Sequence, residues 1–74
     1  MHRFHDLFKQ LGLPYSDHSI AEFIASHRLG DKTLLPHAHF WSAAQSNFLR
    51  ESIEQDADWA ELVDQLNEAL RNGL

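Results

Sequence analysis

Six histidines are the residues of this sequence most able to do chemistry, because imidazole binds metal ions and changes its charge near neutral pH. His37 and His39 flank Ala38 immediately before Phe40 and Trp41, and two imidazoles at this spacing can bind zinc, nickel or copper. A closed metal site needs further ligands, and the chain has no cysteine and no His-Glu-x-x-His pattern to supply them. We therefore expect no bound metal and interpret these histidines as surface residues.

His27 is a separate case because it takes the fourth position of an apolar helical stripe that starts at Ile20. A histidine in such a place usually packs its ring at the edge of the core and hydrogen-bonds through a ring nitrogen. The alternative is a role for His27 in sensing pH or in contacting a ligand, with Trp41 as a rim residue beside a groove. A small-molecule or metal site would then use His27, or His37 and His39, beside Trp41.

The stretch from Glu51 to Glu68 contains seven acidic residues and no Lys or Arg. Four of them are predicted to lie opposite the apolar stripe of the last helix: Asp58, Glu61, Asp64 and Glu68. We interpret them as a solvated face, with a docking surface for a basic partner as the alternative. Helical spacing spreads these carboxylates apart, which disfavours a divalent-cation site.

Other residue types exclude whole classes of function. Three isolated glycines cannot form a phosphate-binding loop, and the chain has no nucleophile-elbow pattern, so we expect neither an enzyme nor a cofactor. The net charge is −5, with six dispersed Lys and Arg against eleven Asp and Glu. This balance argues against binding of nucleic acid. No apolar run reaches membrane-spanning length, and residues 1–6 do not resemble a leader, so we expect a cytoplasmic protein without membrane contact.

The length of 74 residues predicts one domain, 1–74, and 43% hydrophobic residues are typical of a packed chain. In so small a domain, the burial of apolar surface barely outweighs the loss of conformational entropy. No disulfide adds stability, because cysteine is absent. Good helix packing or association with a second copy of the chain must supply the remaining stability, so a homodimer is one possibility.

Apolar residues recur at helical spacing in four segments and predict an all-α bundle. We expect four short helices at approximately 3–11, 17–28, 43–55 and 58–71. Phe48, Leu49 and Ile53 form the predicted buried stripe of the third helix. Whether the third and fourth helices are separate or one bent rod stays open, because no proline divides them.

Local signals predict the helix ends. Gly12 ends the first helix, and Ser16 caps the second, with a capping box of Ser19 and Glu22 as its rival. The remaining signals are a capping box of Ser42 and Gln45, a cap at Asp56 or Asp58, and a stop at Gly73.

The segment 30–41 connects two helices without helical periodicity and contains at most one turn. Its large apolar residues are Leu34, Leu35, Phe40 and Trp41. We expect this apolar loop to fold back over the core. Together with His27, these residues form the predicted interface or groove.

Several short motifs, in their order and spacing, resemble a small bacterial family catalogued as a domain of unknown function. The motifs are Leu11-Gly12-Leu13-Pro14, Phe23-Ile24 with His27, Phe40-Trp41 with Gln45 and Phe48-Leu49, Asp56-Ala57-Asp58-Trp59 and Val63-Asp64-Gln65-Leu66. The resemblance covers nearly the whole chain and implies a stand-alone helical bacterial protein, with no reaction, ligand or partner attached. The segment 28–39 departs most from the family pattern, which argues against a family-wide metal site at His37 and His39.

These observations favour a non-catalytic protein-interaction module. The apolar loop and one helix face are predicted to contact another protein, and a second copy of the chain is one candidate for it. A small-molecule or metal binder is the alternative.

Overall fold

The helices of this protein occupy nearly all the segments predicted to be helical. The structure, a computed structural model, describes residues 3–55 and 57–73. Within these residues there are four α-helices, one 3-10 turn and no strand. Their bounds are α1 Phe4–Gln10, α2 Asp17–Ser26, η1 Leu35–His37, α3 Ala43–Glu54 and α4 Ala57–Asn72. The all-α bundle is therefore confirmed.

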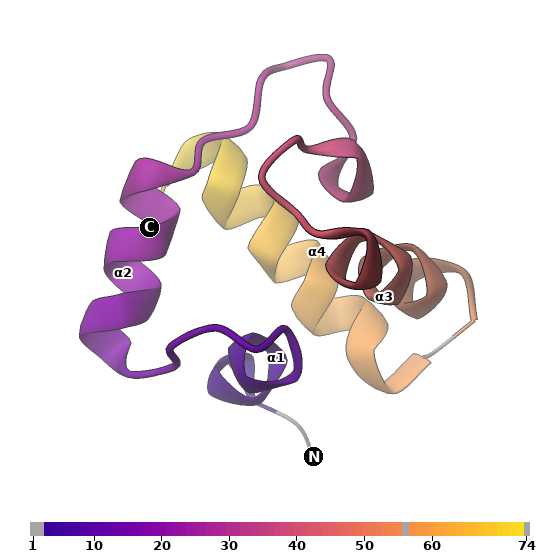
Figure 1. The fold of residues 1–74 in the computed structure, drawn as a ribbon, viewed down its shortest axis with the longest axis horizontal. Coiled ribbons are helices and arrows are strands. Elements are labelled where there is room, and N and C mark those ends of the chain that lie inside the picture. The colour runs from indigo at the N-terminus through magenta and orange to yellow at the C-terminus, as the bar shows by residue number, and fades with distance from the viewer. Residues whose placement is uncertain (1–2, 56, 74) are drawn as a thin grey trace.

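Helix α4 is the central element of the bundle. It packs against α1, α2 and α3, and it runs diagonally between α2 and α3 in Figure 1. The segment 30–41 passes from the end of α2 to the start of α3 and carries η1 against α3. No helix of the described part of the chain is both long and apolar enough to span a membrane.

Side-chain caps set the starts of two helices. Ser16 Oγ accepts a hydrogen bond from the Ser19 backbone N–H (3.1 Å), so α2 begins at Asp17 and the rival box of Ser19 and Glu22 does not start it. At α3, the Gln45 N–H donates to Ser42 Oγ (3.1 Å) and the Ser42 N–H donates to Gln45 Oε1 (2.9 Å). The predicted capping box is present.

Two glycines in the left-handed region end helices where the sequence places them. Gly12 follows α1 with φ +73°, and Gly73 follows α4 with φ +85°. Helix α3 ends at Glu54 and α4 begins at Ala57, so the two are separate helices. Asp58 lies inside the first turn of α4 and is not its cap, and the other predicted cap, Asp56, lies outside the described residues.

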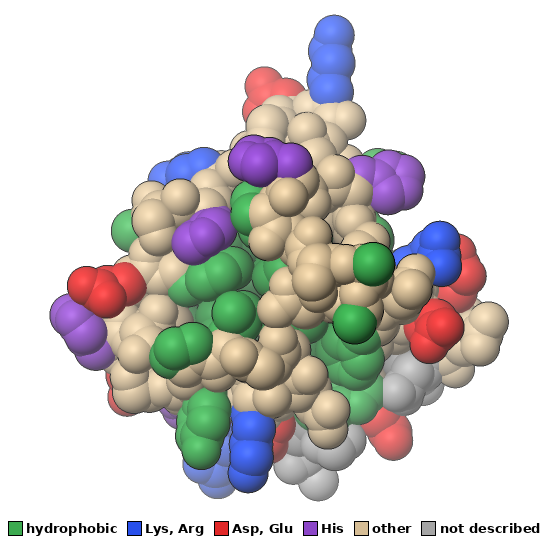
Figure 2. Space-filling model, in the orientation of Figure 1, with side chains coloured by type: hydrophobic (Ala, Val, Ile, Leu, Met, Phe, Trp, Pro, Cys, Tyr) green, Lys and Arg blue, Asp and Glu red, His purple; other side chains and the backbone are tan. Residues whose placement is uncertain are grey.

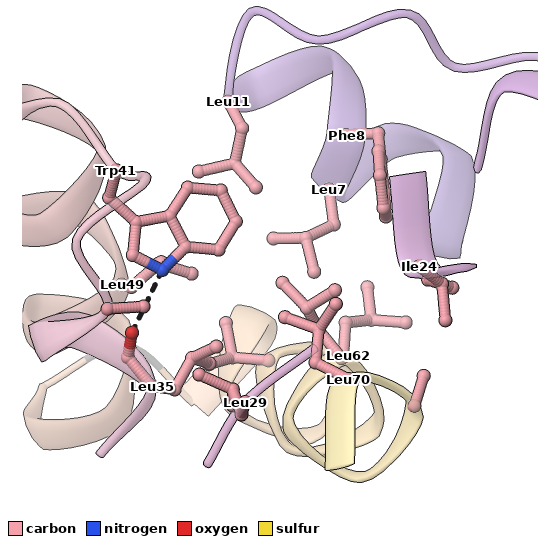
Figure 3. Close-up of a cluster of buried hydrophobic side chains, with 14 of the residues drawn as sticks. Leu7, Phe8, Leu11, Ile24, Leu29, Leu35, Trp41, Leu49, Leu62 and Leu70 are labelled. Atoms are coloured by element: carbon pink, nitrogen blue, oxygen red, sulfur yellow. Dashed lines mark hydrogen bonds between the residues drawn. The ribbon is translucent and has the colours of Figure 1, made fainter. Parts of the chain in front are cut away.

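The core contains buried side chains from all four helices and from the segment 29–41 (Figure 3). Its most buried large members are Leu7, Phe8, Ile24, Leu49, Leu66 and Leu70. Phe48 is half-buried, and its ring lies 5.9 Å from that of Trp59, between α3 and α4. The contact between Phe48 and Trp59 joins α3 to the central helix α4, and α1 packs against the same helix.

The prediction that Ile53 is buried is wrong: its side chain is 53% exposed. The buried side of α3 is centred between Leu49 and Ser52, with Phe48 at its edge. Because a helix turns once in about 3.6 residues, Ile53 lies about a fifth of a turn from that centre, at the edge opposite Phe48. The small side chain of Ser52 takes the buried position instead.

The apolar loop does fold over the core, but one of its residues does not join it. Leu35, Ala38 and Trp41 are buried, whereas Leu34 is 61% exposed. Leu34 stands in extended conformation immediately before η1, and consecutive side chains of extended backbone point in opposite directions. With Leu35 directed inward, Leu34 is left in solvent.

Candidate functional site

An open apolar groove lies between η1, α3 and α4. Its volume is about 850 Å³. Its apolar lining consists of Leu34, Leu35, Pro36, Ile53, Ala60 and Val63. Both exposed aliphatic residues described above, Leu34 and Ile53, therefore line the same groove, one from each side. Leu35 and Val63 are buried beneath them.

Charged residues line the groove unevenly. Helix α4 contributes the exposed carboxylates of Glu61 and Asp64 and, from its last turn, the half-buried guanidinium of Arg71. Helix α3 contributes Arg50 and Glu54, which are one turn apart, and Arg50 Nη2 donates to Asn47 Oδ1 (2.8 Å). The edge formed by α4 is therefore the acidic one.

The acidic edge continues along α4 beyond the groove. A shallower hollow of about 490 Å³ adjoins it and contains Glu61, Asp64 and Glu68. Together with Asp58, these residues are exposed, as expected for the predicted acidic face. The predicted acidic face and part of the predicted apolar surface thus meet at one groove.

Arg71 fastens the apolar loop to the end of α4. Its Nη1 donates to the Gly30 carbonyl (3.0 Å), its Nη2 to the Thr33 carbonyl (2.6 Å), and its Nε to Asn67 Oδ1 (3.0 Å). The Leu29 N–H adds a bond to the Leu70 carbonyl (2.9 Å). From the sequence, Arg71 is expected only to complement the helix dipole, because no local spacing indicates a contact across about 40 residues.

Two further hydrogen bonds hold η1, which forms one wall of the groove, in place. The indole Nε1–H of Trp41 donates to the Leu35 carbonyl at 2.9 Å inside the core (Figure 3). Ser46 Oγ donates to the Pro36 carbonyl (2.5 Å), which joins the turn to α3. Trp41 is thus a buried support of the wall, as expected for an apolar loop that folds over the core, and not the rim residue of the alternative interpretation, because its N–H finds a backbone acceptor inside the fold.

His27 belongs to a packed aromatic cluster of Phe23, His27, Phe40 and Trp41. Its ring stacks on Phe23 (3.9 Å between centroids, 9° between planes) and meets the edge of Phe40 at 5.0 Å. Phe23 also stacks on Trp41 at 5.6 Å. His27 Nδ1 lies 3.0 Å from the Phe23 carbonyl, so this nitrogen carries the proton and donates it. The half-buried His27 fits the first interpretation, a packed histidine at the core boundary.

His37 and His39 are both exposed and diverge in their surroundings. His37 lines the apolar groove, whereas the ring of His39 lies against Phe40 at 5.6 Å. On the face shown in Figure 2 the histidines lie apart from one another. No three His, Asp or Glu side chains of residues 3–55 and 57–73 are placed to hold one metal ion. Of the residues named for the alternative site, His27 lies in the aromatic cluster with Trp41, whereas His37 lines the apolar groove.

Residues 1–70 match the family model described as "Protein of unknown function (DUF2789)". The chain belongs to this family. It is also similar to protein CV0237 from Chromobacterium violaceum, whose solution structure was determined by NMR. The two are 44% identical with a TM-score of 0.85, over 96% of this chain and 90% of that chain. No curated protein matches significantly. The resemblance seen in the sequence is thereby confirmed, and the DUF2789 description names no activity.

Proposed function

We propose that this DUF2789 chain is a non-catalytic protein-interaction module that binds a segment of a different protein in the groove between η1, α3 and α4. The observation that carries the proposal is that Leu34 and Ile53, 61% and 53% exposed, line one groove. Apolar side chains grouped at a concave surface typically mark a binding site, whereas single exposed ones do not.

The supports of the groove favour binding with little reorganisation. Arg71 ties the loop to α4, and Trp41 and Ser46 hold the two carbonyls at the start of η1. A wall fixed in this way before binding loses little conformational entropy when a partner arrives. This supports a preformed site.

A second copy of the chain is a weaker candidate for the occupant. Each copy carries a net charge of −5, so association of two copies brings like net charges together. Self-association is the alternative that the following experiment separates from binding of another protein.

Site-specific photo-crosslinking in cells of the source organism tests the proposal. A photoreactive amino acid replaces Ile53 in the groove, and in a control chain it replaces Tyr15, which is 50% exposed outside the groove lining. We expect one protein, identified by mass spectrometry, to be linked from position 53 and not from position 15. Adding Leu34→Asp should abolish that adduct.

Three results would contradict the proposal. The same adducts from both positions would indicate unspecific contact, and no adduct from position 53 would indicate an unoccupied groove. An adduct of two copies of the chain would assign the groove to self-association.

A further inference from the structure

We infer that the groove accepts one short amphipathic α-helix whose side facing α4 carries Lys or Arg. This inference rests on the proposed function, because it assigns a chemical class to the occupant of the same groove.

The shape of the groove favours a helix over an extended segment. Extended segments bind by adding a strand to a sheet edge or, as polyproline II helices, by docking in grooves lined with aromatic residues. The described part of the chain has no strand, and the groove lining contains no Phe, Tyr or Trp. Walls formed by α3, α4 and η1 instead match the mode in which a helix places apolar residues at i, i+3 or i+4, and i+7 into an apolar groove. The molecule is 28 Å across, so the seated helix has at most about 18 residues at 1.5 Å each.

The charge of the occupant follows from the asymmetry between the two edges. Glu61 and Asp64 are exposed on the α4 edge, and the adjoining hollow extends this edge to Glu68. Arg71 also lines the groove, at the last turn of α4, but it directs its donors to Asn67 and to carbonyls of the apolar loop, so two exposed carboxylates stand against one engaged guanidinium. Partner ammonium or guanidinium groups along this edge would therefore meet carboxylates.

The α3 edge does not show the same preference. Arg50 and Glu54 lie one turn apart there, so positive and negative charge alternate along it. In the bound partner helix, only the flank that faces α4 is therefore predicted to be basic. A helix that is acidic on that flank would meet like charges and bind less tightly.

Two synthetic peptides test the inference directly. Both carry Leu at i, i+4 and i+7, and one has Lys on the flank beside this stripe whereas the other has Glu at the same positions. Binding is measured by calorimetry, and helix formation by the change in circular dichroism on mixing. We expect the Lys peptide to bind at least about tenfold more tightly and to become helical.

Protein variants locate the charge effect. Glu61→Lys with Asp64→Lys reverses the α4 edge and should reverse the preference between the peptides. Asp31→Lys with Glu51→Lys is the matched control, because both residues are exposed, lie outside the groove lining and give the same change in net charge. Leu34→Asp should abolish binding of both peptides.

The possible outcomes separate this inference from the proposed function. Equal binding of both peptides, lost in Leu34→Asp, would overturn the charge assignment and leave the groove as a docking site. Binding without helix formation would overturn the helical occupant. Binding unaffected by Leu34→Asp would overturn both the inference and the proposed groove, and no binding of either peptide would overturn the inference.

Discussion

The apolar loop has two sides that use similar residues in opposite ways. On one side, Phe40 and Trp41 pack against Phe23 and His27, and the rings cover one another. On the other side, Leu34 faces a groove and stays 61% exposed. Apolar residues on the closed side stabilise the fold, whereas those on the open side remain available to another molecule.

The difference arises from which contacts the bundle itself can supply. The closed side is filled by Phe23 of α2 and by His27 at its C-cap, whose rings contact Trp41 and Phe40 of the loop. On the open side, α3 and α4 pack against each other through Leu49, Phe48 and Trp59, and neither covers Leu34. Substitutions on the two sides should therefore differ strongly in their effect on stability.

The largest effect is expected on the closed side, for Trp41→Ala. This substitution removes a buried indole and leaves the Leu35 carbonyl without its donor, so the free energy of unfolding should fall by about 3–5 kcal/mol. Urea denaturation measures it. A loss below about 1 kcal/mol would mean that the loop is not part of the core.

A smaller effect is expected where the loop is tied to α4, for Arg71→Met. Three hydrogen bonds are lost, but the side chain is partly exposed, so we expect a loss of about 1–3 kcal/mol. Hydrogen exchange should also become faster at the Thr33 amide, which donates to the Gly30 carbonyl. Arg50→Met is the control, expected within about 0.5 kcal/mol. Equal effects of the two substitutions would show that the hydrogen bonds of Arg71 do not contribute to the free energy of unfolding.

The helix cap that directly follows the apolar loop gives a reference value. Ser42→Ala removes the acceptor for the Gln45 N–H and should cost about 1 kcal/mol in the same denaturation assay. Ser26→Ala should be nearly neutral, because the hydroxyl of this exposed serine bonds only to groups within one turn, the Glu22 and Phe23 carbonyls and His27 Nδ1. If Ser26→Ala cost as much as Ser42→Ala, the capping assignment would be wrong.

The smallest effect is expected on the open side, for Ile53→Asp. Its side chain is 53% exposed, so the free energy of unfolding should change by less than about 0.5 kcal/mol. Ile24→Asp, at a residue only 2% exposed, should prevent stable folding. A strongly destabilised Ile53→Asp would show that the groove is closed in solution.

Features that depend on neighbouring residues were predictable from the sequence. The Ser42 and Gln45 box, the left-handed glycines Gly12 and Gly73, and the apolar stripe of α4 all act within one or two helical turns. The four helices follow from them, with ends that differ by at most two residues from the prediction.

Features that depend on distant residues were not predictable in the same way. The exposure of Ile53 depends on how α3 is rotated against α4, and the exposure of Leu34 depends on where η1 lies against α3. The Arg71 tie joins residues about 40 positions apart. The sequence therefore placed apolar residues in the loop but could not tell which of them face the groove.

The central claim is that the side of the apolar loop that carries Leu34 contributes little to the stability of the fold. Substitutions at two adjacent residues of the loop test this claim most directly. Urea unfolding of Leu34→Asp and Leu35→Asp compares a residue 61% exposed with one 3% exposed. We predict a change of less than about 0.5 kcal/mol for Leu34→Asp and a loss of more than about 3 kcal/mol for Leu35→Asp. Comparable destabilisation by the two substitutions would contradict the claim.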